Sequence, residues 1–163
     1  GIVNLAIGHT GTHGDRLLSA AHVCAVPVGH RLAGKQVIVP ADIEGEWFIS
    51  QPPHIETRLL IDAMFAAYGV KYQPAQVESP VAATLCSLVA AGQGISLVDP
   101  VTAMEYKGQD LCFIPFEPSV PLEFSVLTPL QSRPTKLVES FLAHLREFVF
   151  TELDPRLVVN SSL

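Results

Sequence analysis

The 163-residue sequence has few basic side chains and no long apolar run, and each shortage excludes a class of protein. Its ten Lys and Arg residues are outnumbered by sixteen Asp and Glu, giving a formal net charge of −6. Binding to phosphates needs clustered Lys and Arg, and here they are scattered, so this segment is not expected to bind nucleic acid itself. Gly, Pro or a charge interrupts every apolar run before the ~18 residues that a membrane helix needs, so no membrane association is expected.

Cysteine is also scarce, with only Cys24, Cys86 and Cys112, which are odd in number and far apart. Each falls in an apolar run typical of a strand or helix, which predicts buried free thiols rather than a disulfide or a zinc site. Because free thiols suit a reducing compartment, we expect a cytoplasmic protein. The apolar surroundings of Cys86 would disfavour a thiolate, and there is no G-x-S-x-G motif, so no catalytic residue is predicted.

What the sequence does have is a large apolar fraction, 48% of its residues, which predicts a well-buried core in one domain or two small lobes. The chain begins at Gly1 without a Met or a signal-peptide pattern, and we expect it to be a fragment of something longer. Strands are predicted at residues 2–7, 21–28, 46–50, 75–78, 95–98, 111–116 and 122–127. Trp47, within one of these strands, is expected in the core, and His22, His30 and His144 on the surface or in loops.

Helical periodicity predicts four helices. Apolar residues at i, i+3, i+4 and i+7 favour an amphipathic helix over residues 54–68, ended by Gly69. Ser79 followed by Pro80 predicts the N-cap and first residue of a second, largely apolar helix that ends at Gly92. A short helix is expected over residues 100–106 and a long one over 134–150.

The alternation of strands and helices within residues 46–98 favours a parallel α/β sheet. In such sheets ligands bind beyond the carboxyl ends of the strands, where helix N-termini direct their free N–H groups. Ser50 and Gln51, Ser79, Asp99, and the stretch that follows Ile7 all lie at such ends. The sequence therefore predicts that these positions converge on one cleft.

Two stretches carry a family resemblance: "AVPVGHRLAGKQVIVPADIEGEWFIS" and, about forty residues later, "AAGQGISLVDP". With the strand and long helix that follow, residues 1–149 resemble the effector-binding domain of LysR-type transcriptional regulators. The sequence "GQGISLVDPVTAMEY", together with "ISQPPHIETR", is most similar to the branch of this family that senses amino acids and opines.

The resemblance implies an α/β fold like a type 2 periplasmic binding protein, with two α/β lobes and the first part of lobe one missing. Residues 1–20 would form part of lobe one and residues 21–120 the complete lobe two. Residues 121–153 would return to lobe one with the long helix, and residues 154–163 would be a tail. The resemblance implies a non-enzymatic sensor that holds a small amino acid or derivative between the lobes and needs no cofactor.

The resemblance also implies partners. DNA would be bound only through an N-terminal winged helix-turn-helix domain that is absent here, in a homodimer or homotetramer. A transport-type solute-binding protein is the alternative, and a small α/β hydrolase using His9 or His13 is a second one.

The predicted ligand-binding residues take part in helix starts or strand ends. They are His9, Thr10, Ser50, Gln51, Pro52, Ser79, Val81 and Asp99. Ser50 and Gln51, with the N–H groups of the following helix, are expected to hold a ligand carboxylate, although the same residues could simply cap that helix. Ser79 could act as a helix cap alone, and Asp99 could either pair with a ligand ammonium or cap the helix opened by Pro100.

The stretch "IGHTGTHGDR" allows other chemistry. His9, His13 and Asp15 could form a zinc trio, but three glycines disfavour the helix on which such spacing usually occurs, and no further His or Cys cluster completes a shell. A phosphate loop is disfavoured because no Lys and no helix follow the glycines. No metal is therefore predicted, and His9 and Thr10 remain as hydrogen-bond donors to a polar ligand or as part of a solvent loop.

Overall fold

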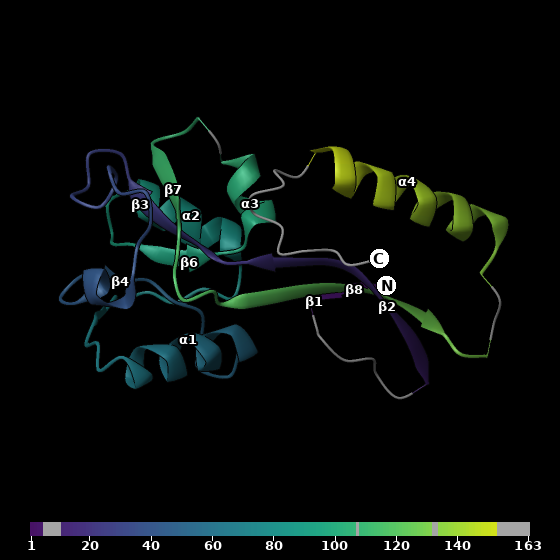
Figure 1. Ribbon diagram of the computed structural model, residues 1–163, viewed down its shortest axis with the longest axis horizontal. Coiled ribbons are helices and arrows are strands. Elements are labelled where there is room, and N and C mark those ends of the chain that lie inside the picture. The colour runs from purple at the N-terminus through teal and green to yellow at the C-terminus, as the bar shows by residue number, and fades with distance from the viewer. Residues whose placement is uncertain (5–10, 107, 132–133, 153–163) are drawn as a thin grey trace. The chain divides into compact units, whose positions relative to one another are not determined.

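The structure is a computed structural model that describes residues 1–4, 11–106, 108–131 and 134–152 (Figure 1). The chain divides into two compact units. One unit comprises Gly1–Ala21 with Pro121–Leu163, and the other comprises His22–Val120. No helix among the described residues has both the length and the apolar character needed to cross a membrane.

The first unit contains a three-stranded antiparallel sheet in the order β1-β8-β2 (Figure 1). Its strands are β1 (Ile2–Asn4), β2 (Thr12–Ala21) and β8 (Pro121–Pro129). The sequence prediction missed β2, because its first half is rich in Gly and polar residues. The strand forms because it pairs with β8 from Thr12 to Ala21, interrupted by one register shift between Arg16 and Leu18. Long-range pairing thus overrides a weak local preference.

The last described element of this unit is α4 (Lys136–Glu152), close to the predicted helix at 134–150 (Figure 1). The apolar stripe predicted for it is largely exposed rather than buried. Leu137 is 80% exposed, Phe141 is 56% exposed and Phe148 is 60% exposed. The period of the pattern therefore identified the helix correctly but did not show what the stripe would contact.

The second unit combines parallel strand pairs within residues 46–98, as predicted, with antiparallel pairs to a strand that lies before this range. Strand β3 (Val23–Pro27) lies between β6 (Ser96–Val98) and β7 (Leu111–Pro115) and is antiparallel to both. The short strands β4 (Trp47–Phe48) and β5 (Gln73–Pro74) are parallel, and Phe48 forms a parallel bridge to Ile95. The strands that are joined through helices are thus parallel, as expected. Only β3 runs the other way, because a loop connects it to β4 instead of a crossover helix.

Three α-helices and one short 3-10 helix complete the second unit. They are η1 (Pro40–Ile43), α1 (Glu56–Ala67), α2 (Ala82–Ala90) and α3 (Pro100–Glu105). Helix α1 ends as predicted: Gly69 follows the C-cap and has a φ of 66°, which glycine adopts without strain. Helix α2 begins later than predicted, with Val81 at its N-cap instead of Ser79. The Ser79 hydroxyl accepts a hydrogen bond from the Val81 N–H at 3.1 Å, and this local turn takes the place of the predicted cap.

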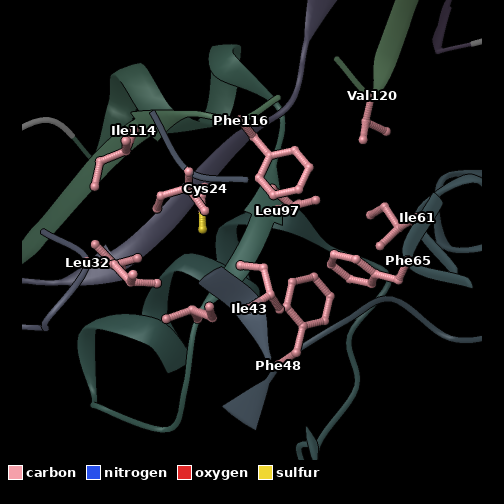
Figure 2. Close-up of a cluster of buried hydrophobic side chains, with 13 residues drawn as sticks. Cys24, Leu32, Ile43, Phe48, Ile61, Phe65, Leu97, Ile114, Phe116 and Val120 are labelled. Atoms are coloured by element: carbon pink, nitrogen blue, oxygen red, sulfur yellow. The ribbon is translucent and has the colours of Figure 1, made fainter. Parts of the chain in front are cut away.

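The core of the second unit is a cluster of aliphatic and aromatic side chains from β3, β4, β6, β7, η1 and α1 and from the segments that connect them (Figure 2). Figure 2 shows Phe48 and Phe65 near its centre, where their ring centroids are 5.3 Å apart in an edge-to-face arrangement. Cys24 lies in the same cluster, and burial raises its pKa. All three cysteines lie within the described residues and are free.

Two side chains of this unit contradict their predicted positions. Trp47 was expected in the core but is 50% exposed, because the alternation along β4 sends its neighbour Phe48 inward instead. His22 was expected at the surface but is only 4% exposed. Its Nδ1 lies 3.0 Å from the Val120 carbonyl oxygen, and burial lowers its pKa.

Candidate functional site

Two of the predicted site segments meet in the second unit. Ser50 and Gln51 follow β4, and Ser79 precedes α2. The Ser79 N–H donates to the Ser50 carbonyl oxygen at 3.2 Å, and the two side chains are buried. This hydrogen bond joins two segments that are almost thirty residues apart in sequence, and each segment leads into a helix.

The centre of this region is Arg58, on the first turn of α1, which the sequence analysis did not select. Its Nη1 lies 2.6 Å from Ser50 Oγ and 2.7 Å from the Gln51 carbonyl oxygen. The same nitrogen forms an ion pair with Glu78, with Nη1 and Oε1 2.9 Å apart. One cation therefore links the end of β4 to the residue that precedes Ser79.

A second set of contacts fixes the other side of the guanidinium. The Nε of Arg58 donates to Asp62 Oδ2 at 2.8 Å, and its Nη2 lies 3.4 Å from the Tyr72 hydroxyl. That hydroxyl donates to Asp62 Oδ1 at 2.9 Å. Burial, with the hydrogen bond to Asp62, raises the pKa of Tyr72, so its hydroxyl keeps its proton for this bond. The sequence signal for Arg58 was its spacing to Asp62, i and i+4 on one helix.

Gln51 is left with an unused acceptor in this region. Its Oε1 is buried and has no hydrogen-bond partner among the described residues. A buried polar atom without a partner costs about 1–3 kcal/mol, so native proteins rarely leave one unpaired unless a ligand or water supplies the bond.

The starts of the two helices add hydrogen-bond donors. Helix α1 begins after Ile55 and helix α2 after Val81, and neither N-cap residue makes a side-chain capping bond. The first N–H groups of a helix favour a nearby anion by ~0.3–1 kcal/mol, and by up to ~2 kcal/mol when partly buried. The predicted residue Pro52 lies between these elements, and its carbonyl oxygen accepts from the Ile55 N–H at 3.0 Å.

Asp99 has a visible structural role at the start of α3. Its carboxylate accepts from the Thr102 N–H at 2.8 Å and from the Thr102 hydroxyl at 2.7 Å. The helix-capping alternative is therefore present in the structure, and the ligand contact of Asp99 stays a prediction. Two other predicted residues, His9 and Thr10, lie outside the described residues.

The zinc site considered for His13 and Asp15 has no support among the described residues. His13 and Asp15 are neighbours on β2, with Nε2 and Oδ1 3.1 Å apart, and both side chains are largely solvent-exposed. Within the described ranges, no group of three or more His, Cys, Asp and Glu residues is placed to hold a metal ion.

A separate hollow of about 360 Å³ lies elsewhere in the second unit. It is lined by Trp47, Ile49, Ala75, Gln76, Val77, Leu88, Gly92 and Gln93. None of the predicted ligand-binding residues lines this hollow, although Ile49 directly precedes Ser50. The half-exposed Trp47 forms part of its wall.

The α/β fold of the two units can be compared with known proteins. The family model for the LysR substrate binding domain matches residues 1–149, and the chain belongs to this family. The family is that of a regulator domain and is not an enzymatic one. Members of this family bind small effectors and DNA.

Individual relatives agree with this assignment. The chain is 40% identical over 136 residues to the transcriptional activator protein LysR of Escherichia coli (strain K12). This match covers 83% of this chain and 43% of that protein. It is 37% identical over 145 residues to the regulatory protein NocR of Agrobacterium tumefaciens (strain T37), covering 89% of this chain and 48% of NocR. The chain thus spans somewhat less than half the length of these relatives.

A solved structure shows the same fold at lower identity. The Synechocystis PCC6803 CcmR regulatory domain, solved in complex with 2-PG, matches with a TM-score of 0.74 and 19% sequence identity. The match covers 93% of this chain and 73% of that one. The α/β class predicted from the sequence is confirmed, and the fold is that of a LysR effector-binding domain.

Proposed function

We propose that this chain senses a small amino acid or amino-acid derivative through Ser50, Gln51 and Ser79 in its second unit. The observation that carries the proposal is the hydrogen bond that joins Ser79 to Ser50 beside the starts of α1 and α2. Further support comes from the unpaired Gln51 Oε1 and from the resemblance to the amino-acid- and opine-sensing branch.

The ligand carboxylate would be held by the hydroxyls of the two serines and by the first N–H groups of the helices. Pro52 and Val81 would shape the walls, since Pro52 follows Gln51 and the Val81 N–H donates to Ser79 Oγ. Such a site is built largely from hydrogen-bond donors, which suits an anionic group on a small polar molecule. His9, Thr10 and Asp99 remain proposed contacts on sequence grounds.

Effector binding would regulate transcription by population shift. A ligand that binds one conformation more tightly than another shifts the equilibrium by that difference in affinity, and equal affinity would produce no response. In the whole regulator, DNA would be bound by a separate winged helix-turn-helix domain in a homodimer or homotetramer, as the resemblance implies. A cytoplasmic location also stays a prediction.

Calorimetric titration tests this proposal directly. The protein is titrated with lysine, diaminopimelate, arginine and octopine, and at least one of them should bind. Replacing Ser50 with Ala should weaken that binding, because it removes a buried donor to the carboxylate. Ser87→Ala is the matched control, since Ser87 is an exposed serine of α2 whose hydroxyl bonds to Ala83. Absence of heat with every amino-acid ligand would refute the proposal.

The two alternatives predict different results. A transport-type solute-binding protein would have no DNA-binding region encoded upstream of Gly1, so the sequence preceding Gly1 decides that case. A hydrolase would turn over ester or phosphate substrates and lose this activity in His9→Ala. Membership of a regulator family disfavours both.

A further inference from the structure

Arg58 is a charged residue whose side chain is mostly shielded from solvent. Its side chain is 12% exposed, compared with 56% for Arg31, another ion-paired arginine of the same unit. Burying a guanidinium costs free energy unless its N–H groups are all hydrogen-bonded. The role of Arg58 can therefore be inferred from the groups to which it donates.

The positive charge of Arg58 is already paired with protein carboxylates, so it is poorly suited to bind a ligand anion. Asp62 and Glu78 supply two carboxylates to one guanidinium, at 2.8 Å and 2.9 Å. A ligand carboxylate placed against Arg58 would have to displace one of them. Arg58 is therefore arranged to hold other groups in position, and those groups are Ser50 and Gln51.

Arg58 determines which polar atoms remain available at this point. A serine hydroxyl has one proton to donate and can accept at its lone pairs. Because Arg58 donates to Ser50 Oγ at 2.6 Å, the Ser50 proton must point away from Arg58. The neighbouring Gln51 presents the opposite polarity, since its buried Oε1 is an acceptor with no partner among the described residues. A donor and an acceptor thus stand on adjacent residues.

Building on the proposed function, we propose that Arg58 is a positioning residue for the effector. The Ser50 hydroxyl, which Arg58 orients, and the Gln51 Oε1 acceptor recognise the carboxylate and the ammonium group of a free α-amino acid. These two ligand groups are attached to the same carbon atom, so adjacent protein groups of opposite polarity can bind both. The Glu78 carboxylate, 42% exposed on its side chain, adds negative charge that favours the ammonium group.

Glycine is the probe that tests this inference, because it carries only the two groups in question. Titration is followed by the amide resonances of Ser50, Gln51 and Ser79 up to roughly 50 mM, which detects binding at the millimolar level. We expect residue-specific shifts with glycine, and a dissociation constant for acetate or methylamine that is about tenfold higher or more, because each lacks one of the two groups.

The Arg58 variants test the positioning role. Arg58→Gln should raise the dissociation constant for glycine by about tenfold, and Arg58→Lys should raise it less, because a lysine keeps the charge but cannot reach all the partners. In a double-mutant cycle, Ser50→Ala with Arg58→Lys should give less than the sum of the two losses, because Arg58 acts through the hydroxyl that Ser50→Ala removes. Arg31→Gln breaks the ion pair with Glu46, which involves neither Ser50 nor Gln51, and should leave the affinity unchanged.

Three results would overturn the inference: no glycine-dependent shift at the three amides, an unchanged affinity in both Arg58 variants, or additive losses in the cycle. The thermal unfolding midpoint is measured for every variant, and if Arg58→Gln does not fold, Arg58→Lys decides. The proposed function is judged separately by calorimetry. If a larger amino-acid ligand binds while glycine causes no shift, the sensing function stands and the Arg58 inference fails.

Discussion

The two units of the chain use their apolar residues differently. In the second unit, aliphatic and aromatic side chains from strands, helices and loops form a cluster whose largest members are fully buried (Figure 2). In the first unit, helix α4 carries an equally regular apolar stripe, but Leu137, Phe141 and Phe148 on it are more than half exposed. The comparison teaches that periodicity determines which face of a helix is apolar, whereas burial depends on what the rest of the fold places against that face.

The largest expected effect lies at the centre of the buried cluster. Phe65→Ala should lower the free energy of unfolding by about 3–5 kcal/mol, because it opens a cavity among Phe48, Tyr72 and Phe116. Urea unfolding, followed by circular dichroism, measures this loss. A change below about 1 kcal/mol would show that the cluster is loosely packed and would weaken the contrast between the units.

Gly94 should be the next most sensitive position of the second unit. Its φ is 143°, and a Cβ added there would lie 2.3 Å from the Trp47 carbonyl oxygen. Gly94→Ala should therefore destabilise the protein by about 1–3 kcal/mol in the same urea experiment. Gly34→Ala is the control, since open space surrounds that position and its φ is not positive; equal losses in both variants would contradict the steric argument.

The hydrogen bonds that support Arg58 should make a smaller contribution. Tyr72→Phe removes the hydroxyl that donates to Asp62 but keeps the ring that packs on Phe48 and Phe65. We expect a loss of about 1 kcal/mol in the free energy of unfolding. If stability is unchanged while ligand affinity falls, Tyr72 serves the site more than the core.

His22 should give the second unit a pH dependence. Burial holds its pKa below the usual value near 6.5, so the folded protein binds this proton less readily than the unfolded chain does. The stability that depends on neutral His22 is present above pH 6.5 and falls as the pH drops below it. Urea midpoints between pH 7.5 and pH 5 should therefore fall less in His22→Gln than in the wild type, whereas His144→Gln on the exposed face of α4 should follow the wild type.

The smallest effect is expected on α4. Phe141→Ser replaces a side chain that is 56% exposed, so the free energy of unfolding should change by no more than about 0.5 kcal/mol. Thermal and urea unfolding both measure it. A loss comparable with that of Phe65→Ala would show that the stripe is covered in solution. The two units would then not differ in how they bury their apolar residues.

Much of the fold was predictable from local pattern, and the candidate site only partly so. Helix α1 was predicted to within two residues at its start and one at its end, because its apolar period and its terminal glycine are local signals. Strand β2 was missed because its partner β8 lies about a hundred residues away in sequence. Ser50, Gln51 and Ser79 were predicted as site residues from the rule that ligands bind at strand ends and helix starts, and their ligand contacts stay a prediction. Arg58 was not predicted, because a charged residue on an amphipathic helix is usually exposed, and only the packing of Tyr72 and Glu78 around it reveals its role.

The sequence by itself determined the family, the α/β class and the positions of the main helices to within about two residues. These depend on short-range preferences and on sequence motifs shared with relatives. The tertiary structure decided the reversed direction of β3, the exposure of Trp47 and the burial of His22 and Arg58. The physical reason is that burial and pairing depend on contacts between segments far apart in the chain, and no local preference specifies which partners will meet.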